Sequence, residues 1–159
     1  MSQTLYVDFR DDGFWAYDVV ASVFLRLLVE AAEKHVAGID GHWLQASIEN
    51  WRWQVQVQDL GISLESDWTP EQLTVVKDLI SEVVSKLEHY DSLPMAGLNA
   101  GEMYPINRGI DPIPANPVRN FGMALRDLVS ESLPKAPEGH WWFYSIDDSP
   151  RTIRKRHGD

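Results

Sequence analysis

Two groups of aspartates are the residues best placed to do chemistry. Asp8 lies near the end of the expected first strand, and Asp11 and Asp12 follow it. Asp147 and Asp148 follow the expected last strand. If those strands were parallel neighbours, the two groups would meet at one end of the sheet. Carboxylates gathered there could bind Mg²⁺ or Ca²⁺, or hold a proton for acid–base catalysis. If the strands are antiparallel, the groups lie at opposite ends and no shared site forms. Turn and cap roles would then explain these residues.

No other residue type completes a known catalytic signature. The sequence has no cysteine, no HExxH pair, no GxSxG turn, and neither GxGxxG nor GxxxxGK[ST]. These absences argue against a zinc site, a hydrolase nucleophile and a phosphate-binding loop. We therefore expect no catalytic residues and no cofactor. Surface or cap roles are expected for the histidines, which are His35, His42, His89, His140 and His157.

The segment of residues 94–117 is the best candidate for a binding site. It is dense in proline and glycine, which break regular elements, yet it also carries apolar side chains such as Met95 and Ile113. We expect an ordered loop that packs on the body and presents its side chains to a partner at low entropic cost. A purely structural wrap is the competing interpretation. The expected partner-binding residues are Glu102, Tyr104, Asn107, Arg108 and Asp111.

The seven tryptophans raise the possibility of an aromatic contact surface, although core packing is the preferred interpretation. A platform for single-stranded nucleic acid would also need a basic groove, which the sequence does not predict. The residues considered for such a platform are Trp51, Trp53, Trp141, Trp142 and Tyr144.

One long helix over residues 14–35 is expected to organise the fold. Its apolar residues recur at three- and four-residue spacing, which places them on one broad face. Asp11 or Asp12 is expected to cap its start, and Gly38 to end it in a left-handed conformation. Charged residues interrupt the apolar run well short of a membrane span, so a buried core helix is predicted.

Four other elements follow from the same patterns. A strand is expected at Thr4–Phe9, where apolar and polar residues alternate. A helix within residues 66–90 should begin at a capping box that starts with Thr69. Another helix is expected at about residues 117–133. Residues 141–146 should form an interior strand or a strand covered on both sides, because bulky side chains occupy both of its faces.

Residues 38–61 allow two interpretations. Apolar and polar residues alternate perfectly over residues 51–58, as in a strand. A single helix would instead carry apolar side chains on two opposite sides, with Trp51 on one and Trp53 on the other. We favour a short helix at residues 41–50 followed by a strand at residues 51–58.

The formal charge of −10 is unevenly distributed along the chain. Residues 151–159 carry a net charge of +3, which leaves −13 on residues 1–150. An acidic body repels phosphate backbones and attracts basic proteins, so we expect a basic protein partner and no nucleic acid. Acidity that serves only solubility is the simpler alternative. Residues 1–150 are expected to form one globular domain, and residues 151–159 a basic, disordered tail.

These observations predict an α+β domain with three main helices and a short fourth, packed on a sheet of about three strands. The lack of cysteine and of a basic–apolar leader favours the cytoplasm, with no membrane partner. For function we expect a non-enzymatic acidic module that binds a basic protein. Immunity proteins, which cover the active sites of basic bacterial toxins, offer an analogy of size and charge. The alternatives are a metal-dependent enzyme that uses the aspartate groups and a homo-oligomeric structural protein. The sequence leaves the oligomeric state open.

Overall fold

The computed structural model describes residues 4–57, 61–98, 109–147 and 150–156, which fold into a single α+β domain. Five strands form a mixed sheet in the order β3-β1-β2-β6-β7. They are β1 (Thr4–Phe9), β2 (Asp12–Tyr17), β3 (Ile62–Ser63), β6 (His140–Tyr144) and β7 (Arg151–Arg154). A second, two-stranded sheet pairs β4 (Ser92–Leu93) with β5 (Ile113–Pro114). The helices are α1 (Asp18–His35), the 3₁₀ turn η1 (Val36–Gly38), α2 (Trp43–Gln56), α3 (Pro70–Leu87), α4 (Met95–Leu98) and α5 (Ala115–Val129).

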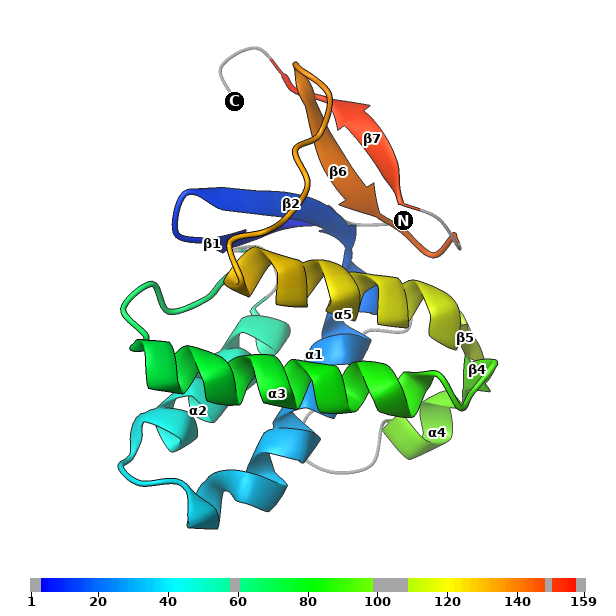
Figure 1. Ribbon diagram of the computed structural model, residues 1–159. Coiled ribbons are helices and arrows are strands. Elements are labelled where there is room, and N and C mark those ends of the chain that lie inside the picture. The colour runs from blue at the N-terminus through cyan, green and yellow to red at the C-terminus, as the bar shows by residue number, and fades with distance from the viewer. Residues whose placement is uncertain (1–3, 58–60, 99–108, 148–149, 157–159) are drawn as a thin grey trace.

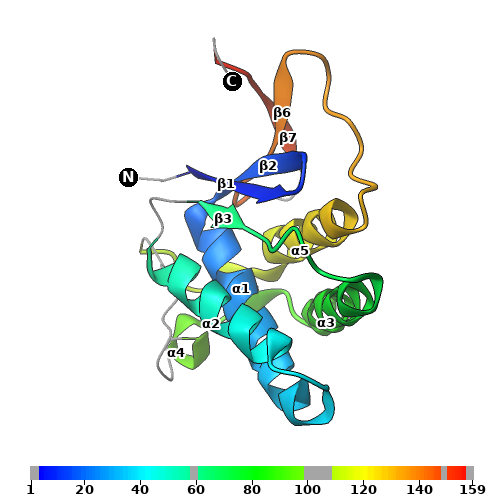
Figure 2. The same ribbon diagram turned by 90° about the vertical axis from the view of Figure 1, so that its left-hand side faces the viewer.

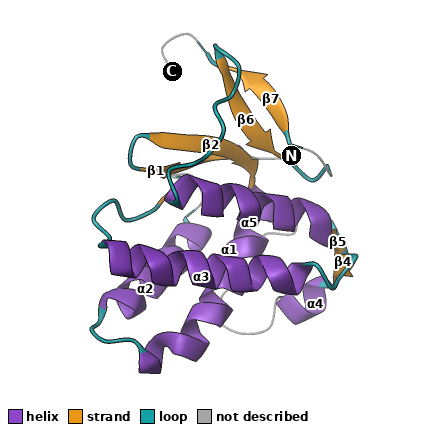
Figure 3. Ribbon diagram, viewed as in Figure 1, coloured by secondary structure: helices purple, strands orange, loops and turns teal. Residues whose placement is uncertain are grey.

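The helices lie on one side of the five-stranded sheet, and α1 is central among them (Figure 1 and Figure 2). α1 contacts α2, α3 and α5. The β1–β2 hairpin lies across the helical layer, whereas β6 and β7 rise away from it (Figure 3). No described helix covers the opposite face of the sheet, so helices and strands form two distinct layers (Figure 1).

α1 is the buried core helix that the sequence predicts, but it begins at Asp18 and not at residue 14. Residues 14–17 instead complete β2, because pairing with β1 satisfies their backbone and turns Phe14 and Ala16 into the core. Asp11 and Asp12 therefore lie in the hairpin and do not cap the helix. Gly38 ends η1 and is not left-handed, contrary to the prediction.

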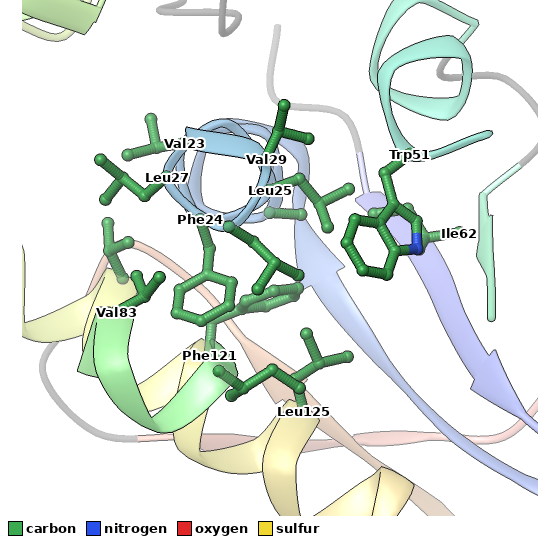
Figure 4. Packing of buried hydrophobic residues seen from close by; sticks show 14 of the residues in the cluster. Val23, Phe24, Leu25, Leu27, Val29, Trp51, Ile62, Val83, Phe121 and Leu125 are labelled. Carbon is green, nitrogen blue, oxygen red and sulfur yellow. The ribbon is translucent and has the colours of Figure 1, made fainter. Parts of the chain in front are cut away.

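The core surrounds α1 on several sides. Phe24 of α1 meets Phe121 of α5, with ring centroids 5.6 Å apart, and Trp51 of α2 lies on a different side of α1, near Leu25 and Val29 (Figure 4). A Cβ atom on Gly122 of α5 would lie 2.2 Å from Cε2 of Phe24. Glycine at this position therefore lets α5 approach α1 closely, although it lowers the intrinsic helix propensity.

The predicted strand at residues 51–58 is wrong, because Trp43–Gln56 forms the single helix α2. Trp51 and Val55 are buried against the core, while Trp53 on the opposite side is 52% exposed. A single helix is disfavoured on sequence alone because it carries apolar side chains on two opposite sides. The side with Trp53 remains in solvent, so a single helix needs burial on one side only. Apolar and polar residues alternate here because Trp51 and Val55 lie on the buried side of the helix and Trp53, an exposed tryptophan, lies between them in the sequence.

Several predicted elements are confirmed. β1 has the predicted bounds, and β6 lies inside the sheet between β2 and β7. The capping box of α3 is complete: Thr69 Oγ1 accepts a hydrogen bond from the Gln72 backbone N–H, and the Gln72 side chain accepts one from the Thr69 N–H. α5 spans Ala115–Val129, close to the predicted helix.

Two local predictions fail. Residues 94–117 were expected to hold no regular element, yet they contain α4 and β5. Residues 151–154 were expected to be a disordered tail, yet they form β7, which pairs antiparallel with β6. β5 pairs with β4 and β7 pairs with β6, and the composition of a segment taken alone carries no signal of such pairing.

Candidate functional site

The predicted partner-binding loop falls mainly outside the described residues, where Glu102, Tyr104, Asn107 and Arg108 lie. Asp111 is described and exposed. Its Oδ1 accepts a hydrogen bond of 3.2 Å from the backbone N–H of Met95. Asp111, which lies just before β5, therefore bonds to the first residue of α4. This contact is structural.

The two aspartate groups do not come together. β1 is antiparallel to β2, and β2 runs parallel to β6, so β1 and β6 are neither neighbours nor parallel. Asp11 and Asp12 lie in the hairpin beside the start of β6, whereas Asp147 follows its end. Asp147 accepts a hydrogen bond from Ser145 Oγ at 3.1 Å, and Asp148 lies outside the described residues. The condition for a shared carboxylate site is not met, and the described residues contain no group of three or more metal-ligating side chains.

The aromatic residues considered as a platform are dispersed over the molecule. Trp51 is in the core, and Trp53 is exposed on α2. Trp142 donates its indole N–H to the Pro134 carbonyl at 2.7 Å. Tyr144 packs edge-on against Phe14, and its burial, followed by the nearby Asp127, raises its pKa to about 12. Trp141 lies against Tyr6 of the same sheet, with ring centroids 5.3 Å apart.

An arginine–glutamate pair joins the β1–β2 hairpin to the end of α5. Arg10 Nη1 and Glu131 Oε1 are 3.0 Å apart, and both residues have a left-handed φ of 55°. Arg10 also donates to the carbonyls of Ser66 and Trp68. The pair borders a cavity of about 560 Å³ whose charged lining mixes both signs, including Asp12 with Lys135. A lining of mixed charge favours neither an anionic nor a cationic ligand. We therefore interpret the Arg10–Glu131 pair as a structural contact between the hairpin and α5.

A groove of about 450 Å³ lies between the end of α1 and one face of α3. We call it the α1–α3 groove, and it is lined by His35, Gly38, Ile39, Val75, Asp78, Leu79 and Glu82. The α3 residues recur at three- and four-residue spacing, which turns them toward the same side of the helix. Apolar side chains of Ile39, Val75 and Leu79 are half-buried or buried, while the carboxylates are exposed. The groove thus joins apolar surface to an acidic rim.

The rim carries unneutralised negative charge. His35 Nε2 lies 3.2 Å from Glu82 Oε2, and that pair is charged on both sides only when the histidine is protonated. Asp78 has no ion-pair partner among the described residues. Glu71 lies two turns before Asp78 on the same side of α3 and is exposed. A cation that enters the groove therefore meets Asp78, a carboxylate that forms no ion pair among the described residues.

Acidic residues also dominate the surface around the groove. In the described part of residues 18–98, Lys34 and Lys86 are the exposed Lys or Arg side chains. The exposed carboxylates of the same part are Glu33, Asp40, Glu49, Asp67, Glu71, Asp78, Glu82, Glu88 and Asp91. The helical layer therefore carries most of the negative charge that the sequence analysis assigned to the body.

The α1–α3 groove was not singled out by the sequence analysis. The repeat of Asp78 and Glu82 on α3 is visible in the sequence as the polar side of a helix. The approach of His35 and Ile39 is not visible, because it depends on how α1 and η1 pack against α3. No local pattern encodes that packing.

Comparison of the chain with protein-family models, curated proteins and solved structures finds no match. Among the described residues, no helix combines the length and apolarity required to cross a bilayer. The candidate site therefore rests on its own geometry: an apolar groove between two helices, with acidic residues along its rim.

Proposed function

We propose that this protein is a non-enzymatic binding module that receives a basic protein on its acidic helical layer, with the α1–α3 groove as the centre of the contact. The observation that carries the proposal is the exposed Asp78, which forms no ion pair within the described part of the chain, beside the apolar side chains of Val75 and Leu79. An apolar centre with a polar rim is the usual anatomy of a protein interface.

A lysine or arginine side chain fits this combination of surfaces. Its methylene stem gains from contact with the half-buried Ile39 and Val75, and its charged end reaches the carboxylates of Asp78 and Glu82. The surrounding carboxylates add long-range attraction, which accelerates encounter with a basic partner more than it strengthens the final complex.

The finer form of the proposal is an immunity-type inhibitor. In that case the basic partner is a toxin, and the acidic layer covers the cationic groove in which the toxin holds its substrate. The charge of the helical layer supports this form, and its test is enzymatic. The partner's activity should be lost in the complex and should return when the interface is disrupted.

The test is affinity capture from an extract of the source cells, with three immobilised proteins: wild type, Asp78→Lys and Glu88→Lys. Glu88 is an exposed carboxylate at the end of the same helix but does not line the groove. Asp78→Lys should lose the basic protein that wild type retains, while Glu88→Lys keeps it. Circular dichroism establishes that both variants fold.

Kinetics of the captured pair provide a second readout. The association rate should fall steeply as salt is raised, because ions screen the attraction over about 10 Å at 0.1 M. Retention of the same proteins by wild type and Asp78→Lys, or an association rate that salt does not change, would overturn the proposal.

A further inference from the structure

The two edge strands of the five-stranded sheet, β3 and β7, differ in whether their outer backbone groups have hydrogen-bond partners. At one edge, β3 is only two residues long, and the side chain of Gln54 closes it. Gln54 Oε1 accepts from the Ser63 backbone N–H at 2.7 Å, and Gln54 Nε2 donates to the Ser63 carbonyl at 3.0 Å. The amide side chain thus occupies the place that a further strand would take. At the other edge, no described residue pairs with the outer side of β7.

The pairing of β7 with β6 fixes which backbone groups point outward. Lys155 N–H donates to the Gly139 carbonyl directly opposite, at 2.8 Å. Hydrogen-bonded and non-hydrogen-bonded positions alternate along an antiparallel ladder. In the register of β6 and β7, Thr152 and Arg154 therefore turn their N–H and C=O groups away from β6. These groups form an open hydrogen-bonding edge.

Positive side chains line this edge. Arg151, Arg154 and Lys155 are exposed, and within the described residues none of them forms an ion pair. Arg151 lies over the ring of Phe143 at 4.9 Å, and Lys155 lies over Trp141 at 4.1 Å. These contacts place the charged ends of the two side chains over rings of β6 without neutralising their charge. The edge is thus positively charged and partly pre-ordered.

We propose that the β7 edge binds an extended acidic peptide segment of another protein, which adds to the sheet as a further strand. Backbone hydrogen bonds to Thr152 and Arg154 would supply affinity, as in other cases of strand addition. Carboxylates placed opposite Arg151, Arg154 and Lys155 would supply charge complementarity across the new strand pair. This site is separate from the α1–α3 groove, takes a partner of the opposite charge, and does not depend on the proposed function.

The competing explanation is that the cations only guard the edge. Lysine and arginine on edge strands keep copies of a protein from pairing with one another. That explanation predicts that an acidic strand-forming peptide gains no backbone hydrogen bonds from β7. Hydrogen exchange at Thr152 and Arg154 separates the two explanations, because only an added strand protects these two amides.

The probe is a short acetylated and amidated peptide in which Glu alternates with Val and Thr. Binding to the full-length protein is measured by calorimetry, and exchange of the Thr152 and Arg154 amides by NMR. We expect saturable binding with slowed exchange at both amides. A peptide of the same sequence that is N-methylated on the edge facing β7 keeps its charge but cannot donate, so it should not bind.

Two variants test the same contact from the protein side. Thr152→Pro removes one outward N–H without removing a hydrogen bond to β6, and it should abolish peptide binding. Thr152→Val keeps the N–H and is the matched control. If Thr152→Pro fails to fold, the N-methylated peptide still decides the question. Equal binding of the N-methylated peptide, preference for single-stranded nucleic acid over the peptide, or absence of binding would each overturn the proposal.

Discussion

At the scale of single residues, Arg10 and Glu131 form an ion pair although both have the left-handed backbone conformation, which is unfavourable for residues other than glycine. Glu131 follows the end of α5, where its N–H reaches the Leu128 carbonyl and the Ser132 N–H reaches that of Asp127. This is the hydrogen-bond pattern of a helix end that usually has glycine at the left-handed position. Non-glycine residues pay about 1–2 kcal/mol there.

Replacement of Glu131 separates backbone strain from the ion pair. Glu131→Gly should be as stable as wild type or up to about 1 kcal/mol more stable, since exposed ion pairs contribute about 1 kcal/mol at most. Glu131→Ala keeps the strain and loses the pair, so it should be the least stable of the three proteins. Urea denaturation measures the order, and a glycine variant less stable than the alanine variant would contradict it.

Tyr144 predicts how stability depends on alkaline pH. The folded protein holds the phenol proton up to a pKa of about 12, whereas the unfolded chain releases it near 10. Unfolding therefore releases a proton between pH 10 and 12, so the stabilising contribution is complete below pH 10 and is lost as pH rises through that window. Tyr144→Phe keeps the ring against Phe14 and should show a shallower loss of the urea midpoint over this range. Parallel curves for the two proteins would rule out this contribution.

At the scale of elements, the sequence predicts those helices and strands whose signals are local, and it misses features that depend on how elements pair. The capping box of α3 and the alternation of β1 are local signals, and both are confirmed. The start of α1 and the formation of β7 depend on pairing with a neighbouring strand, and the pattern within one segment does not record that pairing. The pattern of residues 51–56 is likewise compatible with both a strand and the helix that forms. The same limit applies to the sites. Asp78 and Glu82 share a helical face by spacing alone, but the parallel pairing of β2 with β6 decides where the aspartate groups lie.

Gln54 connects α2 to the edge of the sheet, and its removal should be costly for that reason. Gln54→Leu keeps most of the side-chain volume but leaves the Ser63 N–H and C=O without partners at a partly buried position. We expect a loss of about 1–3 kcal/mol in the free energy of unfolding. Gln56→Leu is the matched control, because Gln56 is exposed on the same helix and should change stability little. Equal losses in the two variants would show that the Gln54 amide does not hold β3.

At the scale of the whole molecule, charge is separated by layer: the helices are acidic and the β7 edge is basic. If the protein self-associates, the acidic helical layer of one copy would attract the basic β7 edge of the next. Such contacts would link the copies head to tail. The described ion pairs are few, and each has at least one side chain that is partly or fully exposed, so they offset little of the repulsion inside the acidic layer.

Salt should therefore stabilise the fold while it weakens the proposed complexes. Repulsion among the carboxylates of the helical layer opposes folding, and added sodium chloride screens it over distances greater than the Debye length. We expect the urea midpoint to rise between low and moderate salt. Asp78→Asn, which removes one charge from the groove rim, should raise the midpoint at low salt and reduce the effect of added salt. Asp12→Asn is the comparison outside that layer, because Asp12 lies in the hairpin and its removal should change the salt response less. A midpoint that falls as salt is added would mean that ion pairs dominate over repulsion, and the acidic layer would then lack the unbalanced field that the basic partner requires.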